Sequence, residues 1–261
     1  MMVNIQKALT EKGKKVFIPY IMAGDGGLET LEEKILYLQE CGADAIEIGI
    51  PFSDPVADGP TIQKAGIRAL GNGTTLRKVL ETIQTFKTKV SIPLILMTYL
   101  NPIVAYGIEK FAEDAAESGI SGCIIPDVPI EEEEFIFPAL ELKGITLIRL
   151  VTLTTPVERI REIGSMSTGF IYAVTVTGIT GARNNFSKEL AGFLSMVKSS
   201  SKVPVLAGFG VSSAKQVREV CEHCDGVIVG SKIIDLFTQN DLAGIKQLIS
   251  TVEEVGLQTY K

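Results

Sequence analysis

The stretch A-I-E-I-G-I-P-F-S-D-P-V-A-D-G-P-T-I-Q, residues 45–63, indicates how this chain folds and where its chemistry lies. Its first six residues alternate as a β-strand does, with three isoleucines on one face and Glu47 on the other. The proline that follows ends the strand, and a polar loop leads to a helix that begins near Thr61. The pattern therefore predicts a strand, a loop and a helix in succession.

Glu47 is the unusual residue of this strand. If the isoleucine face packs against helices, Glu47 points into the interior of a sheet or barrel, where an ionised carboxylate must be paired, protonated or in use. A structural glutamate paired with an arginine or lysine is the alternative interpretation. Because Glu47 lies near the end of its strand and Asp54 and Asp58 follow it, the sequence favours a functional site.

Short β-rich runs alternate with amphipathic helical runs along the whole chain, which is typical of repeated βα units around a parallel sheet. Eight such units in 261 residues predict a single-domain α/β fold over residues 1–261, a (β/α)8 TIM barrel with an extra N-terminal helix near residues 4–12. The expected strands cover residues 16–23, 45–50, 93–98, 122–125, 146–151, 170–174, 203–206 and 227–229. Helices are expected at 28–40, from 61 to a break at 71–73, at 76–86, at 108–117, up to 142 and from Pro156, with a loop around 101–102.

Composition narrows the class of protein. Hydrophobic residues make up 46 % of the chain, and the net charge of −6 with a pI near 5.1 argues against nucleic-acid binding. No apolar run approaches the length of a membrane span, and the first 15 residues contain no signal-peptide segment, so we expect a cytoplasmic protein. The four cysteines suggest no disulfide framework, and the C-E-H-C run at 221–224 lacks the second ligand cluster of a zinc site.

Two glycine-rich turns follow the last two expected strands: G-F-G-V-S-S at residues 208–213 and Gly230-Ser231. Glycines let a backbone approach a ligand closely, and helix starts at Ser213 and Ser231 would offer free N–H groups to an anion. These glycines could also serve only as tight turns. Barrel enzymes often hold a phosphate group at this corner, so the sequence predicts a phosphorylated ligand.

Two acids at a strand end can divide proton transfers when their pKa values differ, and Glu47 with Asp58 is the candidate pair. Asp54 is either a third participant or a brace for the loop. The only histidine, His223, lies far from the acids, and no lysine lies in an expected strand, which argues against metal and Schiff-base chemistry. Tyr172 is a further polar candidate or a core aromatic. The long polar segment after the sixth strand, residues 175–187, is typical of a mobile lid.

Residues 47–63 closely resemble the signature of the tryptophan synthase α subunit family. Further motifs of that family occur in family order along nearly the whole chain: F-I-P-Y-I-M-A-G-D at 17–25, M-T-Y-L-N-P at 97–102, P-D-V-P at 126–129, G-I-T-G at 178–181 and G-F-G at 208–210. The resemblance implies an enzyme that cleaves indole-3-glycerol phosphate to indole and glyceraldehyde 3-phosphate without a cofactor.

The resemblance also implies roles for individual residues. Glu47 would be the general acid and base, Asp58 would accept the hydrogen bond of the indole N–H, and Tyr172 would line the pocket near the reacting centre. Thr180 would order the lid and position Asp58. The remaining implied substrate-binding residues are Gly181, Gly210, Gly230 and Ser231 around the phosphate and Tyr20, Ile62, Phe209 and Ile228 along the pocket walls.

Members of the family pair with a β subunit that carries pyridoxal phosphate, in an α2β2 heterotetramer, so we expect such a partner here. The segments 54–55 and 101–106 would form the contact. Three positions depart from the family pattern: Gly26 stands in place of proline, Thr175 in place of serine and Leu100 in place of an aromatic residue.

Three other functions stay open at this point. The chain could be another phosphate-binding barrel enzyme, although the absent lysines and the spacing of the acids argue against it. It could be a non-catalytic phosphosugar-binding barrel, although both carboxylates are present. It could also be a lyase that releases indole without a partner subunit.

Overall fold

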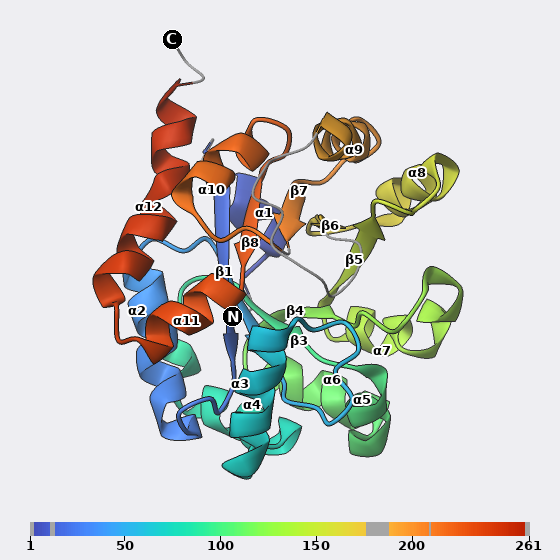
Figure 1. Ribbon diagram of the computed structural model, residues 1–261. Helices are drawn as coiled ribbons and strands as arrows, with labels where there is room; N and C mark the ends of the chain where they lie inside the picture. The colour runs from blue at the N-terminus through green and yellow to red at the C-terminus, as the bar shows by residue number, and fades with distance from the viewer. Residues whose placement is uncertain (1–2, 11–13, 176–187, 209, 259–261) are drawn as a thin grey trace.

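Eight parallel strands close into a barrel in the order β1 to β8, with each strand paired to the next and β8 paired to β1 (Figure 1). The computed structural model describes residues 3–10, 14–175, 188–208 and 210–258. The predicted TIM barrel is therefore confirmed. Its strands are β1 (Val16–Met22), β2 (Ile46–Gly49), β3 (Leu94–Met97), β4 (Ile120–Ile124), β5 (Thr146–Thr152), β6 (Ile171–Val174), β7 (Val205–Gly208) and β8 (Gly226–Val229).

Helices surround the barrel and connect successive strands (Figure 1). The α-helices are α1 (Ile5–Thr10), α2 (Leu31–Glu40), α3 (Pro60–Gly71), α4 (Leu76–Phe86), α5 (Leu100–Tyr106), α6 (Ile108–Glu117), α7 (Phe137–Leu142), α8 (Val157–Met166), α9 (Lys188–Ser199), α10 (Ala214–Cys221), α11 (Ser231–Thr238) and α12 (Leu242–Gln258). The 3-10 helices of the described residues are η1 (Leu28–Thr30), η2 (Lys87–Lys89) and η3 (Ile130–Phe135). Within the described ranges, no helix has the length and apolar character needed to cross a membrane.

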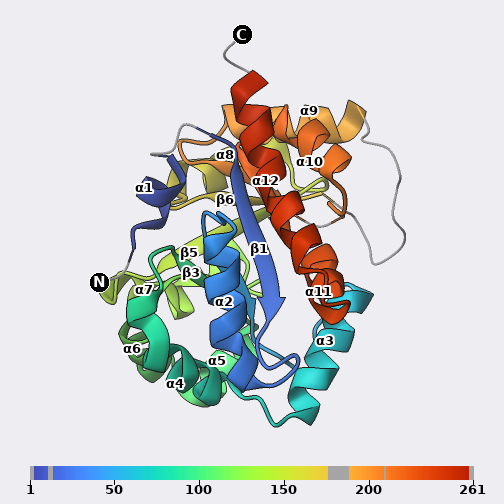
Figure 2. The same cartoon turned by 90° about the vertical axis from the view of Figure 1, so that its left-hand side faces the viewer.

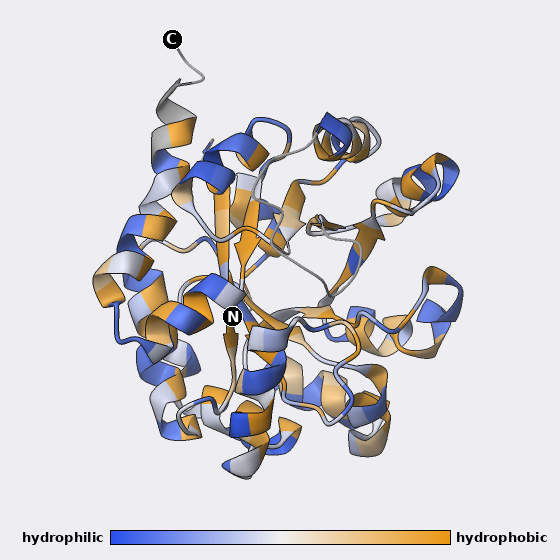
Figure 3. Ribbon diagram, in the orientation of Figure 1, coloured by the Kyte–Doolittle hydropathy of each residue, from blue (hydrophilic) through white to orange (hydrophobic). Residues whose placement is uncertain are grey.

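Two apolar layers arise from the alternation of each strand. One side chain in two packs outward against the helices, as Ile46, Ile48 and Ile50 do, and the next packs into the barrel interior, as Ile95 and Ile148 do. The strands are accordingly hydrophobic on both faces, whereas the helices turn polar surfaces outward (Figure 3). This alternation places Glu47, between two outward isoleucines, on the interior face.

Helix α1 covers the amino-terminal end of the barrel, beside the start of β1 and away from its arrowhead (Figure 2). Ile5 from this helix is 2 % exposed and belongs to the interior cluster. Two glycines make room for it, because a Cβ at Gly122 would lie 2.6 Å from Ile5 Cδ1 and one at Gly169 would lie 3.5 Å from Ile5 Cγ2. The barrel is thus closed at this end by packing, which leaves its opposite end for a ligand.

Three local expectations were wrong. The loop expected around residues 101–102 is helix α5, because Pro102 lies in its first turn, where the absent N–H needs no partner. Pro156 precedes the first residue of α8 instead of starting the helix, with ψ at 149°. Strand β7 covers Val205–Gly208, two residues later than expected, so Gly208 belongs to a strand and not to a turn.

Candidate active site

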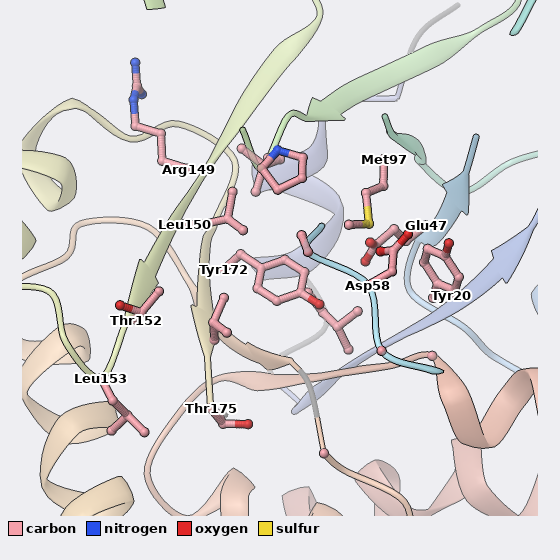
Figure 4. Close-up of a pocket in the computed structure, with 18 of the residues that line it drawn as sticks. Tyr20, Glu47, Asp58, Met97, Arg149, Leu150, Thr152, Leu153, Tyr172 and Thr175 are labelled. Atoms are coloured by element: carbon pink, nitrogen blue, oxygen red, sulfur yellow. The ribbon is translucent and has the colours of Figure 1, made fainter. Parts of the chain in front are cut away.

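A cavity of about 1210 Å³ opens at the carboxyl end of the strands (Figure 4). All nine predicted site residues that lie within the described ranges line it: Tyr20, Glu47, Asp58, Ile62, Tyr172, Gly210, Ile228, Gly230 and Ser231. The other three, Thr180, Gly181 and Phe209, lie outside the described residues, as does most of the predicted lid. The structure therefore brings together residues that are up to 211 positions apart in the chain, from Tyr20 to Ser231.

Glu47 projects from β2 into this cavity and is 1 % exposed. Its Oε2 atom is buried without a hydrogen-bond partner, and none of the ion pairs among the described residues involves it. Burial, and after it the nearby charge of Asp58, raises the pKa of Glu47 to about 8. The structural alternative, a glutamate neutralised by a basic side chain, is therefore not what the described residues show.

Asp58 lies in the loop between β2 and α3 and is 5 % exposed. Its backbone is held on both sides: the N–H donates to Pro55 O over 3.1 Å, and the carbonyl accepts from Gln63 Nε2 over 2.9 Å. Burial raises the pKa of Asp58 to about 6, against the opposing effect of the nearby Tyr99 hydroxyl. Its Oδ1 atom is buried and has no hydrogen-bond partner.

The two carboxyl groups thus have different protonation states near neutral pH. With a pKa of about 8, Glu47 is mostly protonated at pH 7, whereas Asp58, with a pKa of about 6, is mostly ionised. Separate pKa values are what allow one carboxyl group to give a proton while its neighbour stabilises positive charge. The pair is therefore suited to general acid–base chemistry combined with electrostatic stabilisation.

Two tyrosines flank the carboxyl pair (Figure 4). Tyr20 from β1 and Tyr172 from β6 are both buried, and the charges of Glu47 and Asp58 are among the causes that raise the pKa of each hydroxyl. In Figure 4 the Tyr172 ring extends toward the carboxyl groups, while Arg149 points away from them. Ile62 and Ile228 add apolar wall beside these rings, so the pocket offers a flat aromatic ligand both π-faces and acids.

The glycine corner lies on the same cavity. Gly230 precedes α11, whose first residue is Ser231, and a Cβ at Gly230 would lie 3.4 Å from both Tyr20 Cδ1 and Ile62 Cδ1. Gly210 has a φ of +82°, a conformation that favours glycine. The start of α11 leaves backbone N–H groups free for an anion near these glycines. Gly208 has a different role, because the Tyr172 ring lies against it.

The third candidate acid, Asp54, does not line the cavity. Asp54 is exposed, and its carbonyl accepts from Val56 N over 2.9 Å while its carboxylate accepts from Ser53 Oγ over 2.6 Å. These contacts support a bracing role for Asp54 in the loop. Asp25 forms a bidentate ion pair with Arg68 at 2.7 and 2.8 Å.

The C-E-H-C run does not gather a metal site. Cys221 ends α10, and both Cys221 and Cys224 are buried in the outer core. In the part of the chain that the structure describes, no group of three or more histidine, cysteine, aspartate or glutamate side chains is arranged to hold a metal ion.

Sequence reasoning missed two features beside the site. Tyr99 is 3 % exposed and contacts the Asp58 loop, yet it reads as an ordinary core aromatic. Arg149, inside β5, forms a buried ion pair with Glu133 of η3, with Nη2 to Oε2 at 2.6 Å. An arginine in the otherwise apolar run at 147–151 was a signal for it, since a buried guanidinium needs an acidic partner.

The three departures from the family pattern have clear local settings. Gly26 has a φ of +88°, which a proline ring cannot adopt. The loop after β1 therefore has a backbone conformation here that favours glycine and excludes proline. Thr175 donates from its N–H and from its hydroxyl to Gly208 O, at 3.0 and 2.9 Å. Leu100 begins α5 and packs against the outer core.

A closed (β/α)8 barrel with buried acids at the carboxyl end of its strands is the architecture of a TIM-barrel enzyme. Residues 6–260 match the family model described as "Tryptophan synthase alpha chain". The chain therefore belongs to the tryptophan synthase alpha chain family. This agrees with the resemblance seen in the sequence motifs.

Individual relatives support the same family. The tryptophan synthase alpha chain of Bacillus mycoides is 53 % identical over 247 residues, which is 95 % of this chain and 96 % of that protein. Among solved structures, tryptophan synthase subunit alpha from Legionella pneumophila has a TM-score of 0.86 at 34 % identity, covering 98 % of this chain and 99 % of that one. A mutant alpha subunit from Pyrococcus furiosus has a TM-score of 0.81 at 36 % identity, with 93 % and 98 % coverage.

Proposed function

We propose that this chain carries out the α reaction of tryptophan synthase, the cleavage of indole-3-glycerol phosphate into indole and glyceraldehyde 3-phosphate. The observation that supports this most is the burial of two carboxyl groups, Glu47 and Asp58, in one cavity without an ion-pair partner among the described residues. The glycine corner of that cavity suits the phosphate, and the aromatic walls suit the indole ring.

The proton transfers follow from the protonation states of these two carboxyl groups. Protonated Glu47 gives its proton to the indole carbon that bears the side chain, and positive charge develops on the ring. Asp58 accepts the hydrogen bond of the indole N–H and stabilises that charge. The Glu47 carboxylate then takes the proton of the neighbouring glycerol hydroxyl as the carbon–carbon bond breaks and its electrons return to the ring. Glu47 ends protonated, as it began, so the cycle closes without a cofactor on this chain.

We further propose a tryptophan synthase β subunit as partner, with pyridoxal phosphate on that subunit. Apolar side chains are exposed in or next to the segments predicted to meet it: Val104, within 101–106, is 46 % exposed, and Val56, directly after 54–55, is 74 % exposed. A solved structure of tryptophan synthase from M. tuberculosis, in the aminoacrylate-bound form, resembles this chain at 31 % identity and a TM-score of 0.81.

A cytoplasmic location stays a prediction that cell fractionation would test.

The experiment is an assay of indole release from indole-3-glycerol phosphate by the purified chain, with and without the matching β subunit. Indole release that rises on addition of the β subunit, together with a larger complex on a sizing column, supports both proposals. Full indole release that the β subunit leaves unchanged, with no larger complex, indicates a lyase that works alone. Absence of indole in both arms rules out the proposed reaction.

A further inference from the structure

Tyr99 occupies the junction between β3 and α5, next to the candidate site but not on the cavity wall. It precedes the first residue of α5, and its side chain is 3 % exposed. It is absent from the residues that line the cavity, so it is not placed to touch a bound ligand. Any effect of this tyrosine on the reaction must therefore act through a neighbour.

Every polar or ring contact of the Tyr99 side chain in the described residues falls on the segment 52–58. The hydroxyl oxygen accepts from the backbone N–H of Ala57, the residue before Asp58, over 3.0 Å, and the hydroxyl lies close enough to the Asp58 carboxyl group to lower its pKa. The ring packs against Phe52 with 5.3 Å between centroids and 31° between planes. The Tyr99 side chain therefore contacts the segment 52–58 near both of its ends.

The position of Tyr99 is itself fixed from a neighbouring strand. The N–H of Leu100 donates to both carboxylate oxygens of Asp127, over 3.0 and 3.2 Å. Asp127 lies in the loop after β4, so α5 and its preceding residue are held by an acid from the next βα unit. The backbone next to Tyr99 is therefore fixed, and a residue that positions a loop needs such a fixed backbone.

The charged and titratable groups around Asp58 determine how strongly the Tyr99 hydroxyl affects the ionisation of this acid. Glu47 from β2, Tyr20 from β1 and Tyr172 from β6 face the same space, and Asp127 faces Tyr99 from the β4 loop. No arginine or lysine forms an ion pair with Asp58 among the described residues. Burial therefore favours the protonated acid, and the Tyr99 hydroxyl is the group that opposes it.

We propose that Tyr99 is a positioning residue for Asp58: it binds the Ala57 N–H and packs against Phe52, which fixes the loop so that the Asp58 carboxyl group lies beside the Tyr99 hydroxyl, ionised and directed into the cavity. The role in the reaction rests on the function proposed above. The role in the ionisation of Asp58 does not, because it concerns only groups of this chain. Tyr99 also connects helix α5 to the segment 53–57, which leads directly to Asp58.

The test compares Tyr99→Phe with the wild type and with Tyr106→Phe as the matched control. The first substitution keeps the ring against Phe52 and removes only the hydroxyl. The control removes a hydroxyl at the opposite end of α5. There Tyr106 donates to Asp114 over 2.6 Å, and this contact does not involve the Asp58 loop. The pH dependence of kcat/KM for indole release is measured for all three proteins without a β subunit, because Tyr106 lies in the segment predicted to contact that subunit.

The expected result is that the acidic limb of the Tyr99→Phe profile moves to higher pH, so that its kcat/KM falls about tenfold more at pH 6 than at pH 8. Tyr106→Phe keeps the wild-type profile. A loss in Tyr99→Phe that is equal at every pH, or no loss, overturns the proposal.

A second measurement does not depend on activity. The carboxyl carbon of Asp58 is followed by NMR titration in the wild type and in Tyr99→Phe, with the spectrum of Asp58→Asn used for assignment. A higher pKa of Asp58 in Tyr99→Phe supports the positioning role even if no protein releases indole. An unchanged pKa contradicts it even if the lyase reaction is established.

Discussion

The hydroxyl of Tyr20 occupies the space in which a side chain at Gly49 would begin, because a Cβ on Gly49 would lie 1.9 Å from Tyr20 Oη. The same relationship recurs on the other side of the cavity, where a Cβ on Gly208 would lie 2.3 Å from Tyr172 Cε1. Both glycines end strands that neighbour the strand of their tyrosine. Each glycine therefore supports an aromatic ring beside the carboxyl pair.

We expect Gly49→Ala to destabilise the protein by roughly 1–3 kcal/mol and to reduce indole release, because the added methyl group must displace Tyr20. Gly192→Ala is the matched control. Nothing lies within 4 Å of a Cβ at Gly192, and it sits inside α9, where alanine stabilises a helix relative to glycine by about 0.5–1 kcal/mol. Chemical denaturation measures both. Equal stability of the two variants would refute the close fit of Tyr20.

The pH dependence of kcat/KM follows from the two carboxyl groups. We expect a bell-shaped profile that rises near pH 6, as Asp58 ionises, and falls near pH 8, as Glu47 loses its proton. The two apparent values belong to the interacting pair. Indole release is measured from pH 5 to pH 10. Activity that keeps rising through pH 8 to a plateau would show that the reaction does not need protonated Glu47.

The stability of the protein should depend on pH through Glu47. Its pKa is about 8 in the folded chain against an ordinary 4.5, so folding binds a proton between these values. The free energy of unfolding therefore falls as pH rises from 4.5 to 8. Glu47→Gln removes this effect while Asp58 stays in both proteins. We expect its gain in stability over the wild type to be roughly 2–4 kcal/mol larger at pH 9 than at pH 4.

Urea denaturation at the two pH values measures that difference. The glutamine side chain keeps nearly the volume of the glutamate that it replaces, so packing is not the variable. An equal difference in stability at both pH values would mean that Glu47 is not held in its protonated form by burial.

The ion pair of Arg149 and Glu133 should be costly to break from one side. The guanidinium donates to Glu133 from Nε and Nη2 and to Met166 O from Nη1, and both side chains are buried. Arg149→Met leaves Glu133 buried without its cation, for which we expect a loss of about 3–5 kcal/mol. The double variant Arg149→Met, Glu133→Leu should recover most of it. Denaturation curves of the three proteins test this, and a double variant less stable than Arg149→Met would contradict it.

Much of the fold could be predicted because periodicity and local geometry agree along this chain. The alternation around Glu47 placed the isoleucines outside and the acid inside the barrel, as the structure shows. Helix α5 could not be predicted in the same way, since Pro102 reads as a breaker and the acid that accepts the N–H of Leu100, Asp127, lies 27 residues away. Contacts of this kind depend on the tertiary fold.

The candidate site shows the same division. Residues at strand ends, such as Glu47 and Gly230, follow from the rule that barrel enzymes bind ligands there. The contact of Tyr99 with the Asp58 loop and the packing of Tyr172 against Gly208 could not be predicted from that rule. They depend on which side chains reach across from one strand to the next. The assignment of the whole chain to one domain, and the roles of Thr180, Gly181 and Phe209, stay predictions.

The most direct test of the central claim is the rate of indole release by the purified wild type, Glu47→Gln and Asp58→Asn at pH 7, each checked for an intact fold by circular dichroism. Removing a general acid of this kind costs about 10²–10⁴ in rate, so we expect Glu47→Gln to lose at least a hundredfold and Asp58→Asn to fall with it. A folded Glu47→Gln protein that releases indole within threefold of the wild-type rate would contradict the account.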